Sequence, residues 1–400
     1  MPRSTSCFPT CPVRNKLQRL AAVLIVLLAT AGATADELVP LIPPGYVPGG
    51  DDDEKGLWVE MDDFERALQR SATRLRDAEI NAYVFDVMCR VAQDYCNDIR
   101  IYVMRNPHFN ASMGPNGVSQ VWSGLLLRVS SEDELAAVLG HELAHYTQLH
   151  SLERMRRISN AMSVGSFFDL GLAVLGVGVP VGQMVALADA GAFSRDNERE
   201  ADLLGVKFMA AAGYDPTAAA RVWRMIVEEE ERAVVKREKP GLFTMTHPAS
   251  EERVANLEAF VAENWGDGFT ERTAPNRHIT ILEQYYPMLM EDQIDTNRYG
   301  RTEAMLERHR SLGVDDSLVN FFLGEMYRQR GEDGDLERAE QAYRLSTSGS
   351  FPLPAAHHQL GYVYMKQGDN DAARENFEKY LELEPESDER AMIEFYLEDL

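Results

Sequence analysis

The sequence is poor in cysteine and in basic residues. With 4 cysteines among 400 residues, disulfide bonding is limited to one or two bridges. The 40 basic residues face 64 acidic ones, which gives a formal net charge of −24. A chain this acidic repels nucleic acid and anionic lipid, so neither is expected as a general partner. The length predicts two or three domains.

The N-terminal region lacks acidic residues and has the pattern of an export signal. Basic residues precede an apolar run over residues 20–30, and Ala33-Thr34-Ala35 is a small-residue cleavage site. The run, about eleven residues long, is short for a transmembrane helix, which needs ~20. We therefore expect a signal peptide over residues 1–35 that is cleaved after Ala35. An uncleaved membrane anchor is the alternative.

Cleavage of that segment leaves one pair of cysteines, Cys89 and Cys96. An even pair in an exported chain favours a disulfide, and two buried thiols are the alternative. Zinc ligation by this pair is not expected, because the cysteines are too far apart in the sequence for a usual zinc knuckle.

The pattern of apolar residues predicts a mainly α fold (α+β) with a small sheet. Residues 36–60 are expected to form a linker, since their first part is rich in Pro, Gly and Asp. Residues 61–290 then have mostly helical spacing. Two β-type stretches interrupt it, "DIRIYVM" (98–104) and "GVSQVWSGLLL" (117–127). We expect one domain over this range.

Residues 291–400 contain a repeat. In "LGYVYMKQGDNDAARENFEKYLELEP", the residues Leu360, Gly361, Ala373 and Phe377 occupy the helix-packing positions of a tetratricopeptide repeat. An earlier unit begins at Leu323. Such repeats stack into an α-solenoid whose concave surface binds extended peptides or other proteins.

The stretch "LGHELAHYTQLH" (139–150) carries the main chemical signal. A serine cap and three acidic residues precede it, so it is expected to lie within a helix. His141 and His145 are four residues apart and share one helical face, where they can bind one ion together. Glu142 lies beside the open position of that ion. This is the HExxH arrangement of zinc peptidases, in which the glutamate is the general base that takes a proton from water.

The third ligand is expected on another helix, in "FSRDNEREADLLG" (193–205). Glu198 is interpreted as the ligand, and Asp202, one turn later, as the acceptor of the outer N–H of a ligand histidine. Glu200 points away from this face and is interpreted as a solvated charge. His150 is not expected to bind the metal, because "YTQLH" lacks the glycine turn of the metzincin pattern. It is interpreted as a surface histidine or one just behind the ligands.

These motifs carry a family resemblance. "HELAH" followed by "EREAD" resembles the Ste-twenty-four, HtpX and BepA group of gluzincin metallopeptidases, peptidase family M forty-eight. "FNASMGPNGVSQVWSGLL" (109–126) is similar to the family's Asn-Ala loop and active-site edge strand, and "THPASEERVANL" (246–257) to its His-Pro segment. With the signal peptide and the repeats, the chain resembles the periplasmic BepA-type proteases of Gram-negative bacteria.

The resemblance implies a zincin-like domain that binds one Zn²⁺ per chain through His141, His145 and Glu198. It also implies that Glu142 is the general base and that Asp202 stands behind the ligands. The strand "GVSQVWSGL" is then expected to be an exposed edge that pairs with an extended substrate, which selects unfolded segments whatever their sequence. An ordinary strand within the sheet is the alternative.

His247 has two interpretations. It is either the entry residue of a helix that begins at Pro248, or a group that reaches the open site of the zinc. In the second case it caps the zinc site or stabilises the tetrahedral intermediate.

Residues 161–193 are apolar and rich in glycine. A single membrane span is excluded, because His141 and Glu198 lie on either side of the segment and must meet at one ion. The favoured interpretation is a hairpin that covers the cleft. Contact with a membrane, or a docking surface, is the alternative.

Together these features predict an exported zinc-dependent endopeptidase of the periplasm. Its expected substrates are unfolded or extended polypeptides, such as misfolded or stalled envelope proteins. The repeats would position it on an envelope protein or an assembly machinery. The alternative is a periplasmic chaperone or assembly scaffold with a largely latent protease site.

Overall fold

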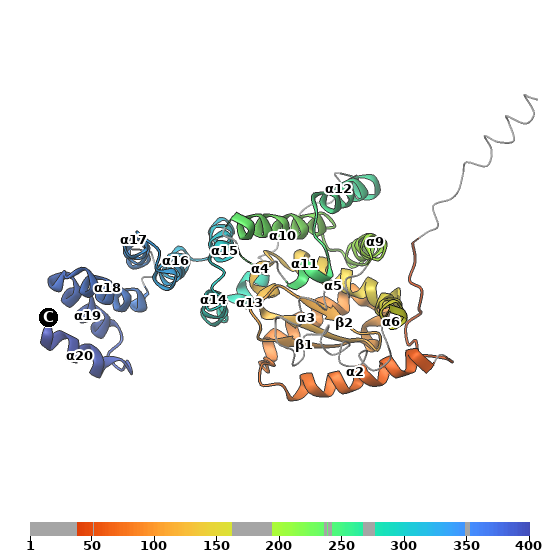
Figure 1. Cartoon of the computed structure of the whole chain (residues 1–400), viewed down its shortest axis with the longest axis horizontal. Coiled ribbons are helices and arrows are strands. Elements are labelled where there is room, and N and C mark those ends of the chain that lie inside the picture. Colours follow the sequence, from red (N-terminus) through yellow and green to blue (C-terminus); the bar gives the residue numbers. More distant parts are fainter. Residues whose placement is uncertain are drawn as a thin grey trace, which may run out of the picture. The chain divides into compact units, whose positions relative to one another are not determined.

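The structure is a computed structural model that describes residues 38–50, 52–161, 194–235, 238, 242–266, 277–348 and 353–400. The expected signal peptide (1–35) and nearly all of the glycine-rich segment (161–193) lie outside the described residues. Helices dominate, and one small sheet accompanies them, as the sequence predicts (Figure 1).

The helices and strands follow one another in this order. The N-terminal part contains α2 (Asp52–Arg70), α3 (Ala78–Ala92), β1 (Arg100–Met104), β2 (Ala111–Met113), β3 (Val118–Trp122), α4 (Ser123–Arg128), α5 (Glu132–Thr147) and α6 (His150–Ala161). The middle part contains α9 (Arg195–Ala211), α10 (Thr217–Val235), α11 (Leu242–Thr246), α12 (Glu251–Trp265), α13 (Arg277–Glu283), α14 (Tyr286–Ile294) and α15 (Tyr299–Ser311). The C-terminal part contains α16 (Asp316–Arg330), α17 (Asp335–Thr347), α18 (Pro354–Gln367), α19 (Asn370–Leu383) and α20 (Arg390–Asp399).

The sheet has the strand order β1-β3-β2, with β1 parallel and β2 antiparallel to β3. The central strand is therefore β3, and all of its residues are buried. The prediction that this segment is an exposed edge is wrong, because both of its sides are paired within the sheet. The edge strand that contacts α5 is β2.

The predicted second strand is also too long. Residues 123–128 form α4 and not a continuation of β3. The Ser123 hydroxyl and the Gly124 N–H both donate to the Asn106 carbonyl, at 3.0 and 2.8 Å. A Cβ at Gly124 would collide with the backbone of Pro107, so this close crossing requires glycine. The crossing takes the chain out of the sheet after Trp122, although the leucines that follow are compatible with a strand.

Apolar side chains pack on both faces of the sheet. Figure 1 shows α2 running along the strands, and its side chains join Val118 and Trp122 of β3 in one cluster. The α2 members of this cluster are Leu57, Met61, Phe64 and Leu68. The helix begins at Asp52, inside the range expected to be a linker, and its first turn is acidic, which suits the positive end of the helix dipole. On the other face, Val103 and Val121 join a larger core with α3 and α5.

A disulfide joins Cys89, near the end of α3, to Cys96 in the short 3-10 helix Gln93–Asp98. Their Cα atoms are 4.7 Å apart. The predicted bridge is confirmed, and the alternative of two buried thiols is wrong.

Two buried histidines hold the C-terminal end of α4. His278 of α13 donates from Nε2 to the Leu126 carbonyl at 2.9 Å, and His309 of α15 donates to the next carbonyl, that of Leu127, at 2.8 Å. Each ring accepts a hydrogen bond at Nδ1 from a tyrosine hydroxyl at 2.8 Å. The last carbonyls of a helix lack partners within the helix, so these contacts stabilise its end. Helices from beyond residue 276 thus complete the structure around α4.

These two histidines predict how stability depends on pH. Burial lowers the pKa of His278 to about 4 and that of His309 to about 3, from an ordinary value near 6.5. Their contribution to stability is therefore present above pH 6.5 and is lost as pH falls from there through the folded-state pKa values. As pH falls from 6.5 to 4, the unfolding free energy is expected to decrease. We expect this decrease to be less steep in His309→Gln than in the unaltered chain, by about 1.4 kcal/mol per pH unit. Urea unfolding at several pH values measures this slope, and parallel slopes for the two proteins would contradict it.

The C-terminal helices show the repeated contact that the sequence predicts. Gly324 of α16 lies against the ring of Tyr343 of α17, and Gly361 of α18 lies against Phe377 of α19. A Cβ at either glycine would collide with the ring. The two units thus pack in the same way, as expected for a tetratricopeptide array.

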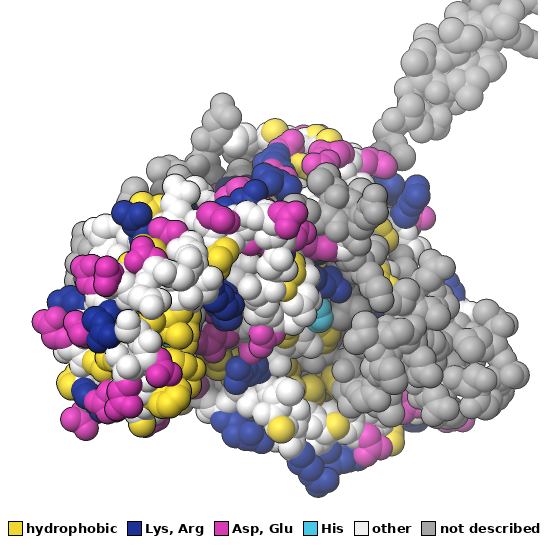
Figure 2. Space-filling model, turned by 60° about the vertical axis from the view of Figure 1, so that its left-hand side comes forward, with side chains coloured by type: hydrophobic (Ala, Val, Ile, Leu, Met, Phe, Trp, Pro, Cys, Tyr) yellow, Lys and Arg dark blue, Asp and Glu magenta, His cyan; other side chains and the backbone are white. Residues whose placement is uncertain are grey.

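Acidic side chains are mixed with basic ones on the face shown in Figure 2. Within the described ranges, no helix combines the length and the apolar character that a membrane crossing requires.

Candidate metal centre

The central helix α5 carries the HELAH motif. Ser131 caps it by accepting a hydrogen bond from the Glu134 N–H at 3.2 Å, and its first turn is acidic. From Glu134 onward every residue of the helix is buried, and His141 and His145 are 4% and 1% exposed. The motif therefore lies inside the domain, on a helix fixed on all sides.

The second helix of the site, α9, crosses α5 at two glycines. A Cβ at Gly205 would lie 2.8 Å from the backbone nitrogen of His141, and a Cβ at Gly140 would lie 2.8 Å from the carbonyl oxygen of Gly205. Only glycine at both positions allows the two backbones to come this close. The crossing brings the Glu198 and Asp202 face of α9 against the histidine face of α5.

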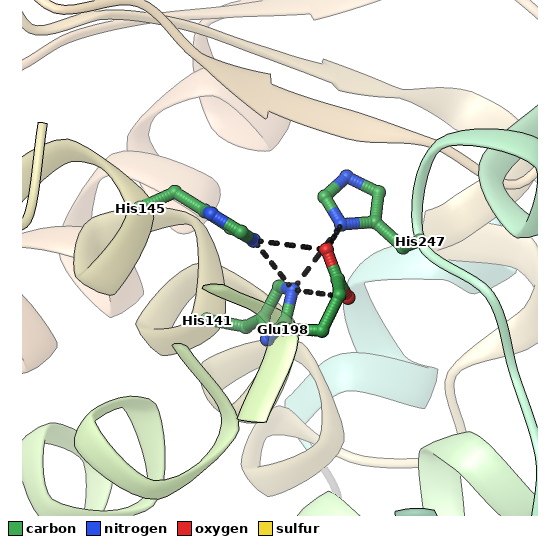
Figure 3. Close-up of side chains that lie close together, drawn as sticks. All are labelled: His141, His145, Glu198 and His247. Atoms are coloured by element: carbon green, nitrogen blue, oxygen red, sulfur yellow. Dashed lines mark hydrogen bonds and ion pairs between the residues drawn. The ribbon is translucent and has the colours of Figure 1, made fainter. Parts of the chain in front are cut away.

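Four donor atoms converge at this crossing. One atom each of His141, His145, Glu198 and His247 lie within 4.8 Å of one another, and all four residues are buried (Figure 3). The two Nε2 atoms of His141 and His145 are 3.1 Å apart, and Glu198 Oε1 lies 2.9 Å from His247 Nδ1. Lone pairs gathered so closely in a buried space are best compensated by a cation. Imidazole and carboxylate donors suit a transition-metal ion, so the group can hold one.

Electrostatics favours the metal-binding forms of two of these groups. Burial would raise the pKa of Glu198, but the electrostatic interaction with His247 and the hydrogen bonds with His145 and His247 hold it well below 4.5. Burial lowers the pKa of His145 well below 6.5 and outweighs the hydrogen bond with Glu198. A carboxylate and a neutral imidazole are the forms that bind a metal.

Asp202 lies behind His141, where the sequence predicts an acceptor. Its Oδ1 is 3.1 Å from His141 Nδ1. Burial alone would lower the pKa of His141, but the hydrogen bond to Asp202 and the charge of Glu198 raise it. Arg253 of α12 donates to both oxygens of Asp202 and lies 2.7 Å from Glu198 Oε2. Its guanidinium stacks 3.5 Å from the centre of the Trp223 ring.

Sequence reasoning missed Arg253. It lies in the segment 246–257 that resembles the His-Pro segment, but no spacing links it to Asp202 on a different helix. Its position in that segment, six residues after His247, could have indicated that Arg253 lies near the site.

Glu142 is buried, 3% exposed, on the β2 side of α5. Burial raises the pKa of its carboxyl above 4.5. A backbone hydrogen bond from Met113 in β2 acts in the opposite direction. Within the described residues its Oε1 makes no hydrogen bond, and His247 Nε2 is 3.7 Å away. The carboxylate therefore stands beside the four donors and next to the edge strand, free to bond a further group.

His247 belongs to the cluster. Its backbone N–H donates to the Phe243 carbonyl at 2.7 Å, and its ring stacks on the Phe243 ring, with 4.5 Å between the ring centres. The expected helix start at Pro248 is wrong, because α12 begins at Glu251 with Ser250 as its cap. The structure therefore agrees with the second interpretation of His247, because its side chain lies among the donors and not at a helix entry.

The structure distinguishes between the two interpretations of His150 and corrects that of Glu200. His150 is 2% exposed, so it is not a surface residue, and its Nδ1 lies 2.9 Å from His145 Nδ1. Glu200 Oε2 is 3.3 Å from His150 Nε2, so Glu200 is not merely a solvated charge. The interpretation of His150 as a residue just behind the ligands agrees with its position.

Comparison with known proteins finds matches to two parts of the chain. The family model described as Peptidase family M48 matches residues 74–261, and one described as Tetratricopeptide repeat matches residues 354–387. The mitochondrial metalloendopeptidase OMA1 of Schizosaccharomyces pombe is 34% identical over 187 residues, which cover 45% of this chain and 53% of that protein.

Two bacterial relatives match a longer stretch at lower identity. The beta-barrel assembly-enhancing protease of Yersinia pestis is 27% identical over 256 residues, 59% of this chain and 51% of the relative. That of Escherichia coli (strain K12) is 26% identical over 262 residues, 61% of this chain and 52% of the relative. The chain thus spans about half the length of these curated relatives.

Proposed function

Because the chain carries a peptidase family M48 domain followed by a tetratricopeptide repeat, we propose that it is a zinc-dependent endopeptidase. One observation carries the proposal. Four buried donor atoms converge within 4.8 Å, and a fifth buried group, the carboxylate of Glu142, stands beside them with an unbonded oxygen.

We propose that His141, His145 and Glu198 hold one zinc ion per chain, with Asp202 and Arg253 fixing His141 and Glu198 from behind. His247 supplies a fourth donor in the arrangement described, which favours its role as a cap on the zinc site. Zinc bound there would act as a Lewis acid and make water acidic enough to lose a proton near neutral pH.

The chain's own residues supply the remaining chemistry of the proposal. Glu142 takes the proton from water during attack on the peptide carbonyl and passes it to the leaving amine. Its raised pKa suits a group that must both accept and release a proton. Within the described residues β2 is an edge strand of the sheet and lies next to Glu142, so an extended polypeptide can add to the sheet there. Backbone pairing selects unfolded segments over folded ones.

The proposed substrates are misfolded or stalled envelope proteins, and the proposed location is the periplasm. The N-terminal pattern of residues 1–35 and the disulfide support export. The bacterial relatives are named as proteases that enhance beta-barrel assembly. The repeats would then position the peptidase on an envelope protein or an assembly machinery. A chaperone or scaffold with a latent protease site is the competing proposal, which the repeats also support.

We further propose that the peptidase domain extends through α15, beyond the boundary at residue 290 expected from the sequence. Met305 and Leu306 of α15 are fully buried in the main core. Arg308 of the same helix lies 2.9 Å from Glu229 of α10. The repeat array would begin after this helix.

Metal content tests the ligand assignment. We expect one zinc per purified chain, and its loss in His141→Ala and Glu198→Ala, because removing a ligand leaves an incomplete site. Asp196→Ala is the control, since Asp196 is an exposed carboxylate on the same helix α9 as Glu198. Elemental analysis by mass spectrometry measures the stoichiometry. Full zinc content in Glu198→Ala would overturn the assignment.

A further inference from the structure

A third histidine of the HELAH region lies directly behind the metal centre. His150 is the first residue of α6 and follows the end of α5 after a short turn. Leu149, in that turn, has φ 53°, a left-handed conformation that residues other than glycine rarely adopt. This turn directs His150 back toward α5, where its ring centre lies 5.0 Å from that of His145.

The direction of the hydrogen bond between the two rings follows from the site. His145 Nε2 faces the donor cluster, 3.1 Å from His141 Nε2 and 3.4 Å from Glu198 Oε1. To bind a metal, this nitrogen must carry a lone pair, so in the neutral ring the proton sits on Nδ1. His145 Nδ1 is therefore the donor to His150 Nδ1, at 2.9 Å.

The direction of this hydrogen bond also determines which nitrogen of the His150 ring carries the proton. If its Nδ1 accepts, the proton of the neutral His150 ring lies on Nε2, which is 3.3 Å from Glu200 Oε2. A continuous path results, in which His145 donates to His150 and His150 donates to Glu200. The arrangement parallels that of the other histidine ligand, because His141 Nδ1 faces Asp202 at 3.1 Å.

We infer that His150 is a positioning residue that fixes the tautomer and ring orientation of His145, and that Glu200 fixes His150 in turn. This inference rests on the proposed zinc site. Groups that accept the outer N–H of a metal-bound histidine contribute ~10–100-fold to metal affinity. His150 would thus strengthen zinc binding although it does not touch the ion.

The test measures the zinc dissociation constant of the full chain by competition with a chelator. His150→Leu removes the acceptor and is expected to weaken zinc binding ~10–100-fold. His150→Asn restores an acceptor near the position of Nδ1 and is expected to bind zinc nearly as tightly as the unaltered chain. Glu200→Gln, a change at a partly exposed side chain that preserves the fold, is expected to weaken binding to a smaller extent.

His278→Leu is the matched control. His278 is as deeply buried and is hydrogen-bonded to Tyr83 and Leu126, but it does not belong to the donor cluster. It should lower stability and leave zinc affinity unchanged. If His150→Leu binds zinc as tightly as the unaltered chain, if His150→Asn restores nothing, or if His278→Leu weakens binding equally, the inference is wrong.

The outcomes separate this inference from the proposed function. An unaltered chain that binds no zinc, or that keeps its zinc in His141→Ala, overturns both. A chain that binds zinc through His141 with an affinity insensitive to His150 overturns only the inference. The visible spectrum of the Co²⁺-loaded protein gives a second readout, since a change in the orientation of His145 is expected to shift its absorption bands in His150→Leu and not in His278→Leu.

Discussion

Glu142→Gln is expected to lower hydrolysis of an unfolded polypeptide by ~10²–10⁴-fold, because it removes the general base while preserving the shape of the side chain. Zinc is expected to stay bound, since Glu142 is not among the four converging donors. The fold should also persist, because Glu142 Oε1 makes no hydrogen bond within the described residues and the glutamine amide can occupy its place.

The measurement compares the cleavage rate of a labelled unfolded protein with the zinc content of the same preparation. Glu228→Gln is the control, because Glu228 is an exposed carboxylate on α10, away from the donors. Cells that carry either variant are then compared for turnover of envelope proteins. If Glu142→Gln supports turnover and envelope integrity as fully as the unaltered chain, the peptidase proposal fails and the scaffold proposal replaces it.

Two pairs of residues in the candidate site could be predicted, because the residues of each pair lie on a single helix. The spacing of His141 and His145, or of Glu198 and Asp202, places each pair on one face by helical geometry alone. The meeting of the two pairs depends on the glycine crossing of α5 and α9, which no periodic pattern indicates. For the same reason, the contact of Arg253 with Asp202 was not predicted, because its partners come from separate helices.

The role of the strands could not be read from the sequence. Five consecutive buried residues in β3 are compatible with an edge or a central strand, because burial on both faces says nothing about pairing. β2 and β3 pair antiparallel across a short connection, and the order β1-β3-β2 arises because β3 also pairs in parallel with the earlier strand β1. The sequence left two interpretations of His150 open for a related reason, since the left-handed turn at Leu149 redirects its side chain after the helix ends.

Cutting the chain before Arg301 is expected to unfold the proposed peptidase domain. The cut removes the side chains of Met305 and Leu306, which are 0% exposed, and burial of such side chains contributes about 1.5–3 kcal/mol each. It also removes Arg308, one of the two arginines that hold the pKa of the buried Glu229 at about 2 against the effect of burial. The rest of α15, which packs against α10, is lost as well, and a domain has only about 5–15 kcal/mol of stability in total.

A cut after Ser348 is the matched comparison, because it removes α18 to α20 and leaves the main core, which ends at Met326, intact. The shorter chain without α15 should show no cooperative thermal transition and no zinc. The chain that ends at Ser348 should keep the cooperative transition, the zinc and the cleavage of an unfolded polypeptide. It should lose only binding that depends on the last repeat. Thermal unfolding followed by circular dichroism and limited proteolysis distinguish the two. If a chain that ends at Gly300 melts cooperatively at the temperature of the full chain and retains its zinc, then α15 is not part of the peptidase domain and the boundary near residue 290 is right.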